Sequence, residues 1–217
     1  MSIISEQSAA EFVKGSGAFM IADRRVAELY PECLSERSFI VDSGEELKSF
    51  AKVETFIKWL ADNGCNRGSE IVALGGGTVG DMAGFAAAIY MRGVKFHNIP
   101  TTLLSMVDSA IGGKTAVNVG SIKNLVGAFH QPTNVIIDIA FLKSITDNDF
   151  LSGFGEIIKT AAIADQSLFN MLLNERDRVL RREIGDIITR VCNIKADTVR
   201  RDPYDNGIRV ILNAGHT

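Results

Sequence analysis

Three groups of residues in this sequence have types and spacing that could support chemistry. The first is the glycine-rich segment at residues 75–81, where glycines would let backbone N–H groups approach a phosphate. The second is Gly112-Gly113-Lys114-Thr115, in which a lysine follows two glycines. The third is Glu156 with Lys159, which share one helical face because they are three residues apart. Each group can also be explained by a structural role alone, as a turn or as a surface ion pair.

The glycine-rich residues 75–81 follow a predicted strand and open a helix rich in small residues. This arrangement is typical of dinucleotide binding but also occurs as an ordinary turn, and the pattern leaves both open. Two features depart from the standard motif. It begins near residue 75 instead of in the first strand–helix unit, and it closes with Asp81, whose charge would repel a phosphate at the helix N-terminus. A dinucleotide bound in a non-standard orientation is compatible with both.

Gly112-Gly113-Lys114-Thr115 looks like the end of a Walker A loop, but Asp108 occupies the position of the upstream glycine that this loop requires. A glycine turn with a solvated lysine is the structural alternative. The surrounding span is turn-rich and dense in polar side chains, which favours an anion site. These side chains are Thr101, Thr102, Asp108, Lys114, Asn118, Lys123 and Asn124.

A pair such as Glu156 and Lys159 is usually a surface ion pair that contributes only about 0.3 kcal/mol. The flanking Phe154, Ile157 and Ile158 indicate instead that this helical turn is largely buried, which favours a functional pair. Lys195 likewise interrupts an apolar helical stripe.

The elements that must position these residues alternate between strands and helices in the first two-thirds of the chain. A helix is predicted over residues 46–63 from apolar residues at i, i+3 and i+4. Short apolar runs predict strands at residues 18–22, 38–41, 71–74, 95–99 and 134–139. Strands separated by helices favour a parallel sheet with right-handed crossovers.

After about residue 144 the pattern becomes helical. Helices are predicted over residues 150–164, 166–174 and 182–200, whereas residues 208–212 fit a short strand or the start of a helix. We therefore expect an α/β nucleotide-binding domain with a mostly parallel sheet at residues 1–144. We expect the first part of an all-helical domain at residues 145–217.

Composition excludes several classes of protein. The 217 residues are 46% apolar with a net charge of -3 and no basic run, which excludes a disordered chain and a general nucleic-acid binder. No apolar stretch approaches the roughly 20 residues that cross a membrane, and the N-terminus lacks the features of a signal peptide. The three scattered cysteines indicate neither a disulfide framework nor a metal site. We therefore expect a cytoplasmic protein without membrane or nucleic-acid partners.

Taken in order, the motifs resemble those of the 3-dehydroquinate synthases from about residue 20 to residue 217. Besides the three groups above, the segments that carry the resemblance are Gly44-Glu45-Glu46-Leu47-Lys48-Ser49, Tyr90-Met91-Arg92-Gly93, Pro100-Thr101-Thr102-Leu103-Leu104, Val107-Asp108-Ser109, Lys123-Asn124, Gly127-Ala128-Phe129, Ile194-Lys195-Ala196 and Leu212-Asn213-Ala214-Gly215-His216-Thr217.

The resemblance implies a lyase of the shikimate pathway, which leads to chorismate and the aromatic amino acids. Such an enzyme converts 3-deoxy-D-arabino-heptulosonate 7-phosphate into 3-dehydroquinate and phosphate. It implies NAD bound by the first domain and a divalent metal in the second, with zinc expected and cobalt as the alternative. It also implies a homodimer in which Arg92 reaches the site of the neighbouring subunit.

Individual roles follow from this resemblance alone. The positions matching NAD contacts are Asp23, Ser43, Gly44, Glu45, Lys48, Gly76, Gly77, Asp81, Thr101, Thr102, Asp108, Lys114, Lys123, Phe141 and Ser144. The positions matching substrate-binding or catalytic residues are Arg92, Lys114, Asn124, Lys159, Lys195, Arg209 and Asn213. Glu156 and His216 match two of the three metal ligands.

Two other functions remain open. One is a related sugar-phosphate cyclase, such as 2-deoxy-scyllo-inosose synthase, although Gly112-Gly113-Lys114-Thr115 favours the 3-dehydroquinate synthases. The other is a noncatalytic nucleotide-binding domain or fragment. The family motif continues beyond Gly215-His216-Thr217 to the third metal ligand, and two protein ligands are fewer than a catalytic zinc site normally has. We therefore expect the 217-residue chain alone to be catalytically inactive.

Overall fold

The computed structural model describes residues 1–4 and 7–215, which form two compact units. The first unit comprises Met1–Thr101 and Gly113–Asp138, and the second comprises Thr102–Gly112 and Ile139–Thr217. Residues 102–112, which the sequence pattern places in the first domain, therefore belong to the second unit.

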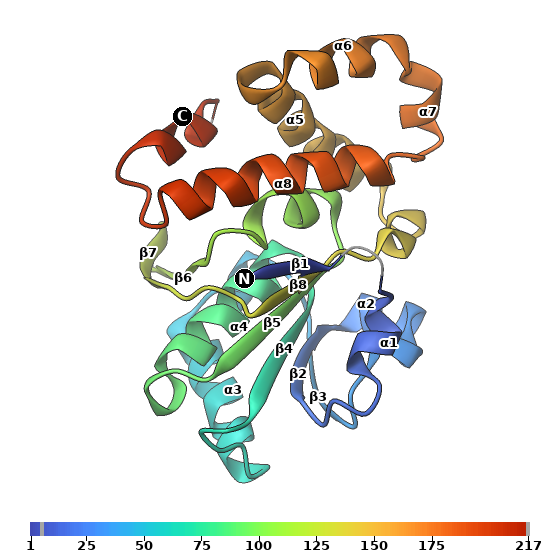
Figure 1. The fold of residues 1–217 in the computed structure, drawn as a ribbon. Helices are drawn as coiled ribbons and strands as arrows, with labels where there is room; N and C mark the ends of the chain where they lie inside the picture. The colour runs from blue at the N-terminus through green and yellow to red at the C-terminus, as the bar shows by residue number, and fades with distance from the viewer. Residues whose placement is uncertain (5–6, 216–217) are drawn as a thin grey trace. The chain divides into compact units, whose positions relative to one another are not determined.

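A six-stranded sheet forms the centre of the first unit (Figure 1). All neighbouring strands are parallel, in the order β1-β8-β5-β4-β2-β3, so the predicted mostly parallel sheet is confirmed. Its strands are β1 (Ser2–Ile4), β2 (Phe19–Asp23), β3 (Arg37–Val41), β4 (Glu70–Gly75), β5 (Lys95–Pro100) and β8 (Asn134–Ile136). The sequence pattern predicts five of them with small differences at the ends and misses β1, which is short.

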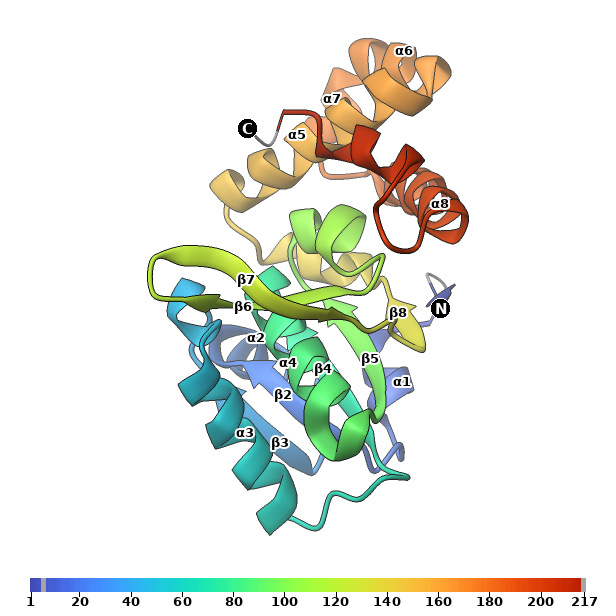
Figure 2. The same ribbon diagram turned by 90° about the vertical axis from the view of Figure 1, so that its left-hand side faces the viewer.

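Helices cover both faces of this sheet. Helices α3 (Phe50–Asp62) and α4 (Gly77–Ile89) lie on one face, and α1 (Ala9–Val13) and α2 (Arg24–Leu29) lie on the other (Figures 1 and 2). Buried side chains of α3 and α4 share one apolar core with β2 and β4. Three short 3₁₀ turns complete the connections: η1 (Pro31–Cys33), η2 (Glu45–Leu47) and η3 (Tyr90–Arg92).

The predicted helix over residues 46–63 is interrupted near its start. Helix α3 begins only at Phe50, because the backbone of Ser49 is extended and pairs with Asn118. The 3₁₀ turn η2 lies before this break. Such long-range pairing has no signal in the local apolar spacing from which the helix is predicted.

Residues 114–129 form an antiparallel ribbon instead of the turn-rich loop that the sequence suggests. Its strands, β6 (Lys114–Val119) and β7 (Ile122–Phe129), pack against α4 (Figure 2). Thr115 and Val117 of β6 are buried, as expected for alternate residues of a half-covered strand. A methyl group on Gly84 of α4 would overlap Thr115, so this glycine permits the close packing.

In the described part of the second unit, all regular elements are helical. They are η4 (Ser105–Ser109, a π-helix), the 3₁₀ turns η5 (Ile139–Lys143) and η6 (Ile208–Asn213), and the α-helices α5 (Asp147–Ala164), α6 (Gln166–Asn174), α7 (Arg176–Leu180) and α8 (Gly185–Arg201). The helix predicted from residue 182 begins later because Arg182 has a φ of 58°. No helix among the described residues combines the length and apolarity that a membrane span requires.

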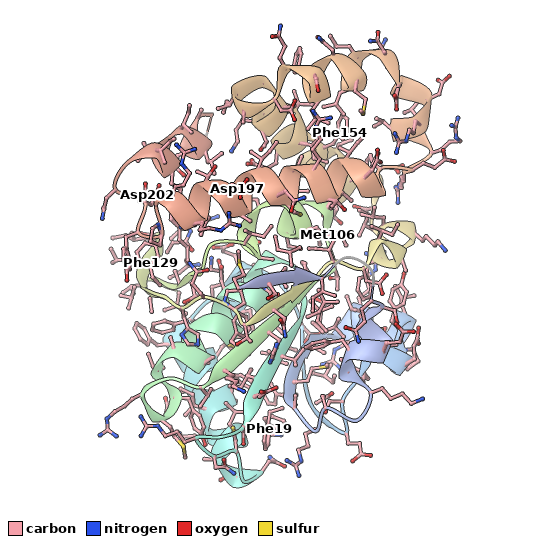
Figure 3. All side chains as sticks on the ribbon, viewed as in Figure 1. Phe19, Met106, Phe129, Phe154, Asp197 and Asp202 are labelled. Carbon is pink, nitrogen blue, oxygen red and sulfur yellow. The ribbon has the colours of Figure 1, made fainter. Side chains whose placement is uncertain are left out.

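Helix α8 lies beside η4 and α5 within this unit (Figure 1). The thiol of Cys192 is 3.3 Å from the carbonyl oxygen of Met106, which lies under α8 (Figure 3). Gly153 lets α5 approach η4, because a methyl group at this position would overlap the backbone nitrogen of Leu104. These contacts fix the relative positions of η4, α5 and α8, which carry Asp108, the Glu156–Lys159 pair and Lys195.

Acid sensitivity of the first unit should arise at His97, a buried residue of β5. Its Nε2 lies 3.1 Å from Glu70 Oε2, and its Nδ1 lies 3.1 Å from Asn134 Nδ2. Burial lowers the pKa of His97, and the carboxylate of Glu70 opposes this only in part. Because the folded-state pKa lies below about 6.5, the stability contribution of neutral His97 is lost as the pH falls below 6.5 through that lowered pKa.

Urea unfolding of the chain at pH 7 and pH 5 should therefore show a loss of stability that His97→Gln reduces. The pKa of Glu70 is itself lowered, chiefly by its hydrogen bond with Lys95, so this carboxylate titrates below the tested interval. His130→Gln, which retains His97, is the matched control. An equal loss in the wild type and in His97→Gln would contradict the assignment.

Candidate functional site

The glycine-rich turn joins the buried strand β4 to helix α4. Gly76 is the N-cap of α4. Because glycine has no side chain, the N–H groups of the first helical turn receive no side-chain cap from this residue. Gly75 and Gly80 have packing reasons of their own. A Cβ on Gly75 would lie 2.8 Å from Val79, and one on Gly80 would lie 2.9 Å from Asn98. The turn thus serves close packing and leaves a helix N-terminus suited to a phosphate.

Asp81 does not carry an uncompensated charge beside this turn. The Nζ of Lys48 lies 2.5 Å from Asp81 Oδ2, and the two side chains are 6% and 19% exposed. Lys48 also donates a hydrogen bond to Asn124 Oδ1. The repulsion of a phosphate by Asp81, which the sequence suggests, is therefore offset by a lysine 33 residues away in the chain.

A polar network connects the η2 turn with the ribbon. Asn118 Nδ2 donates to Glu45 Oε1 at 2.8 Å, and the backbone N–H of Asn124 donates to Asn118 Oδ1 at 2.8 Å. Lys123 lies 3.9 Å from Glu45. The structure therefore brings together five candidate residues of the first unit: Glu45, Lys48, Asp81, Lys123 and Asn124.

Four further cofactor candidates of the first unit, Asp23, Ser43, Gly44 and Thr101, lie near the carboxyl ends of strands. Asp23 ends β2 and caps α2 by accepting a 3.0 Å hydrogen bond from the N–H of Val26. Thr101 follows β5, and its N–H donates to Gly75 at 3.0 Å. Ser43 and Gly44 follow β3 and are exposed. Because the strands are parallel, these ends share one edge of the sheet, where α/β proteins bind nucleotides.

Three candidates lie apart from these groups. Lys114 is exposed at the start of β6, and Arg92 is exposed in η3 with a φ of 67°. Thr102 belongs to the second unit, where its Oγ1 donates to Ser105 Oγ at 2.8 Å. The residues from Thr101 to Asn124 therefore do not form a single anion-binding loop, because a π-helix and a β-ribbon divide them.

Glu156 and Lys159 form the pair that their spacing predicts. Lys159 Nζ lies 2.6 Å from Glu156 Oε1, and both side chains are largely buried. The same ammonium group donates a 2.6 Å hydrogen bond to the carbonyl oxygen of Leu212 in η6. The pair therefore connects α5 to the turn that carries Arg209 and Asn213.

Lys195 and Asp108 form a second ion pair. Lys195 Nζ donates to the Asp108 carboxylate and, at 2.5 Å, to the Asp108 carbonyl oxygen. Burial lowers the pKa of Lys195, whereas Asp108 and, more weakly, Glu156 act in the opposite direction. Asp108 lies in the π-helix η4, and both its carbonyl oxygen and its carboxylate contact Lys195 of α8. Lys195 is therefore paired with Asp108 and also lies near the carboxylate of Glu156.

Arg209 is more buried than Lys159 and Lys195, with 4% of its surface exposed. Its Nη1 donates to the carbonyl oxygens of Gly112 at 3.1 Å and Pro203 at 3.2 Å. Burial lowers the pKa of Arg209, and the carboxylates of Asp205 and Asp108 oppose this. Gly112 has a φ of 114°, and a methyl group there would overlap the guanidinium group. Asn213 is exposed and donates to Asp205 at 3.3 Å.

These residues define a cationic cluster in the second unit, consisting of Lys159, Lys195, Arg209, Glu156 and Asp108. Asp202 and Asp205 also lie near Arg209, so the fit to an anionic ligand rests on the N–H donors of the three cations and not on an excess of positive charge. No group of three His, Cys, Asp or Glu side chains suited to a metal occurs among residues 1–4 and 7–215. Glu156 is described, whereas His216 lies outside the described residues.

Phe141 and Ser144, the remaining cofactor candidates, belong to the η5 turn and its end.

Asp202 is a residue that the sequence pattern does not identify as part of this site. It ends α8 (Figure 3), and its carboxylate accepts backbone hydrogen bonds from Asn206 (3.1 Å), Gly207 (2.7 Å) and Arg209 (3.1 Å). Partial burial raises the pKa of Asp202, but these N–H donors outweigh it and hold the pKa below the usual value. Asn206-Gly207 is a turn signal, but no local pattern shows that a preceding carboxylate shapes the turn.

Asp202→Ala in the intact protein should raise the dissociation constant for inorganic phosphate by about tenfold, because the turn that orients Arg209 loses three acceptor contacts. Asp197→Ala on the same helix is the matched control, since Asp197 pairs with Arg200 at the surface (Figure 3). Phosphate titration of both variants by calorimetry tests this prediction. Equal dissociation constants would show that Asp202 has no influence on Arg209.

Solved structures with this fold include sugar-phosphate cyclases. One is the 2-epi-5-epi-valiolone synthase of Streptomyces hygroscopicus subsp. jinggangensis, with NAD⁺ and Zn²⁺ bound, which has a TM-score of 0.88 and 25% identity. Another is a 2-deoxy-scyllo-inosose synthase in complex with carbaglucose-6-phosphate, NAD⁺ and Co²⁺, with a TM-score of 0.82 and 27% identity. Each match covers 99% of this chain and 64% of the other.

In sequence, the chain is similar to the 3-dehydroquinate synthases. The models of the N-terminal and C-terminal parts of 3-dehydroquinate synthase match residues 38–152 and 153–217. The 3-dehydroquinate synthases of Acidithiobacillus ferrooxidans and Enterococcus faecalis are 45% and 46% identical over 91% of this chain. The chain belongs to the 3-dehydroquinate synthase family. It spans 58% of the length of these two relatives.

Proposed function

We propose that this protein acts as a 3-dehydroquinate synthase, which converts 3-deoxy-D-arabino-heptulosonate 7-phosphate into 3-dehydroquinate and phosphate. The observation that carries the proposal is the match of both family models, which run consecutively from residue 38 to residue 217. Because the chain spans only 58% of the length of its relatives, the activity is proposed for the intact protein.

NAD is the proposed cofactor of the first unit. The open N-terminus of α4, the Lys48–Asp81 pair and the shared edge of the parallel strands support this assignment. When bound, NAD would supply reversible oxidation: it would take a hydride from the carbon that bears a substrate hydroxyl, and the resulting ketone would make the neighbouring C–H bond acidic enough for phosphate to leave before the hydride is returned. Lys48 would hold Asp81 in place and limit its repulsion of the pyrophosphate.

The cationic cluster of the second unit is the proposed site for the anionic groups of the substrate. Lys159, Lys195 and Arg209 carry hydrogen-bond donors that match carboxylate and phosphate oxygens. Their existing partners hold each cation in place, since Lys159 bonds Leu212, Lys195 bonds Asp108 and Arg209 bonds Gly112. Asn213 would add a neutral donor from the same turn as Arg209. The buried positions exclude water and strengthen these contacts.

A divalent metal is the proposed second cofactor, with Glu156 and His216 as two of its ligands. The zinc- and cobalt-containing structures of related cyclases support a divalent ion without deciding between the two metals. Glu156 offers a buried carboxylate of the type that zinc accepts, and the ion would polarise a substrate oxygen. The carboxylate at present accepts a hydrogen bond from Lys159, so this ammonium group would hold Glu156 in place beside the metal.

The intact protein is proposed to be a cytoplasmic homodimer in which Arg92 enters the neighbouring site. The exposed side chain of Arg92 and its left-handed backbone conformation are compatible with this. Sedimentation equilibrium of the intact protein tests the dimer. Mixed dimers of Arg92→Ala and Glu156→Gln subunits test the sharing of sites, because one wild-type site can form only if Arg92 acts across the interface.

Phosphate release tests the proposed reaction directly. The intact protein, supplied with NAD and a divalent metal, should release phosphate from 3-deoxy-D-arabino-heptulosonate 7-phosphate. A competing function as a 2-deoxy-scyllo-inosose synthase is supported by the TM-score of 0.82, although at a lower identity. Turnover of a hexose 6-phosphate alone would favour that alternative. The absence of turnover with both compounds, in a protein that binds NAD, would favour a noncatalytic nucleotide-binding role.

A further inference from the structure

Arg182 makes an unusual set of contacts for a residue in a helix–helix connection. It lies between α7 and α8, and its φ of 58° places its backbone in the left-handed region, which costs a non-glycine residue roughly 1 kcal/mol. Its Nη1 donates hydrogen bonds to the carbonyl oxygens of Leu142 at 2.7 Å and Ile145 at 3.0 Å. Its Nη2 donates to Asp147 Oδ1 at 2.7 Å.

The ring of Phe150 completes these surroundings, because Cζ of Arg182 lies 5.0 Å from its centroid. One guanidinium group therefore holds two backbone carbonyls, one carboxylate and one aromatic face. All four partners lie 32 to 40 residues earlier in the chain, in the segment that leads from η5 into α5. A planar group with donors in a fixed fork can satisfy all of them at once, whereas the single ammonium group of lysine cannot.

The segment that Arg182 holds is the turn with two proposed NAD contacts. Phe141 and Ser144 are linked within this turn by hydrogen bonds of 3.1 Å from the Ser144 N–H and hydroxyl to the Phe141 carbonyl. The Leu142 carbonyl lies between these two residues, and the Ile145 carbonyl directly follows them. Arg182 thus fixes the backbone within and just after the pair, while its own side chain remains only 23% exposed.

We propose that Arg182 is a positioning residue for the cofactor, which holds the turn at residues 141–145 in the conformation that binds NAD. This inference rests on the proposed use of NAD and on the NAD contacts that the family resemblance assigns to Phe141 and Ser144. Loss of the guanidinium group would leave the two carbonyls without these donors, and the turn would sample other conformations. NAD would then bind mainly to the fraction of molecules with the correct turn, so its apparent affinity would fall.

NAD titration of the intact protein by calorimetry tests this inference. Arg182→Met should raise the Kd for NAD by about tenfold, and Arg182→Lys should raise it by a smaller factor. Arg181→Met is the matched control, because the neighbouring Arg181 pairs with Glu183 and both side chains are more than half exposed. This control should bind NAD like the wild type.

A kinetic comparison separates positioning from general loss of structure. Arg182→Met should raise the KM for NAD while the KM for the sugar phosphate stays unchanged, measured well below the unfolding temperature of the variant. A wild-type Kd in Arg182→Met would overturn the inference, and so would an equal loss of affinity for NAD and the sugar phosphate. If the wild type itself bound no NAD, the proposed cofactor would be wrong and the inference would fail with it.

Discussion

Glu156→Gln in the intact protein should lower turnover by about a hundredfold or more, because a ligand of the proposed metal loses its charge. Glutamine has nearly the same volume, so the packing of α5 is retained. The variant should also lose stoichiometric metal binding while its NAD affinity stays unchanged, since Glu156 pairs with Lys159 and neither residue is a proposed NAD contact. Phosphate release, metal analysis of the purified protein and NAD titration measure these three properties.

Glu183→Gln is the matched control for this change. Glu183 lies in the same unit but pairs with Arg181 at the surface, where more than half of each side chain is exposed. An exposed pair of this kind contributes little to stability, so the control should retain activity and metal. Wild-type turnover of Glu156→Gln would remove Glu156 from the reaction. Simultaneous loss of NAD binding would indicate a structural role.

Lys195→Met should lower turnover by roughly a hundredfold to a thousandfold, the range seen when one donor to a developing charge is removed. The ammonium group is held by the carbonyl oxygen and one carboxylate oxygen of Asp108 and is part of the cationic cluster. Methionine matches the length of the buried aliphatic chain and removes only the charge and the donors. The substrate would then lose one of the three cations proposed to bind it.

The stability of this variant should change much less than its activity. Burial lowers the pKa of Lys195 in spite of Asp108, so this environment disfavours the ammonium group relative to water. Asp108 has 29% of its side chain exposed and can therefore be hydrated after the substitution. Breaking a fully buried pair costs about 3 to 5 kcal/mol, but here we expect a change within about 1 kcal/mol of zero.

The lowered pKa of Lys195 also determines the direction in which the stability of the protein changes with pH. Between the lowered folded-state pKa and about 10.4, the unfolded chain binds more protons at Lys195 than the folded chain, so the wild type gains stability as the pH rises. Lys195→Met should remove this gain. Urea unfolding of both proteins at pH 7 and pH 10 measures it, with Lys58→Met in an exposed pair of α3 as the matched control. A large loss of stability at pH 7 would contradict this explanation.

Much of the fold could be predicted from local patterns. Short apolar runs predict five of the six strands of the sheet, and helical spacing predicts α5, α6 and α8 with small differences at their ends. The Glu156–Lys159 pair could also be predicted, because three residues along a helix bring two side chains to the same face. The roles assigned by resemblance to Arg92, Lys114 and Asn213 stay predictions.

The features missed by the sequence pattern depend on partners far away in the chain. The ribbon β6–β7 contains glycines, asparagines and lysines that are typical of turns, and only its packing on α4 makes it a pair of strands. Strand β1 is three residues long and depends on pairing with β8, more than 130 residues later. Its local sequence carries too little periodicity to predict a strand.

The apolar periodicity and the ordered motifs are sufficient to establish the α/β sheet, the change to helices near residue 144 and the family. They cannot show that Lys48 compensates Asp81, that Lys195 pairs with Asp108, or that Arg182 holds the turn at residues 141–145. Each of these contacts joins residues separated by 33 to 87 positions. Backbone periodicity depends on near neighbours, whereas the partner of a buried charge is fixed only when folding removes water and the charge must find a counter-charge within the protein.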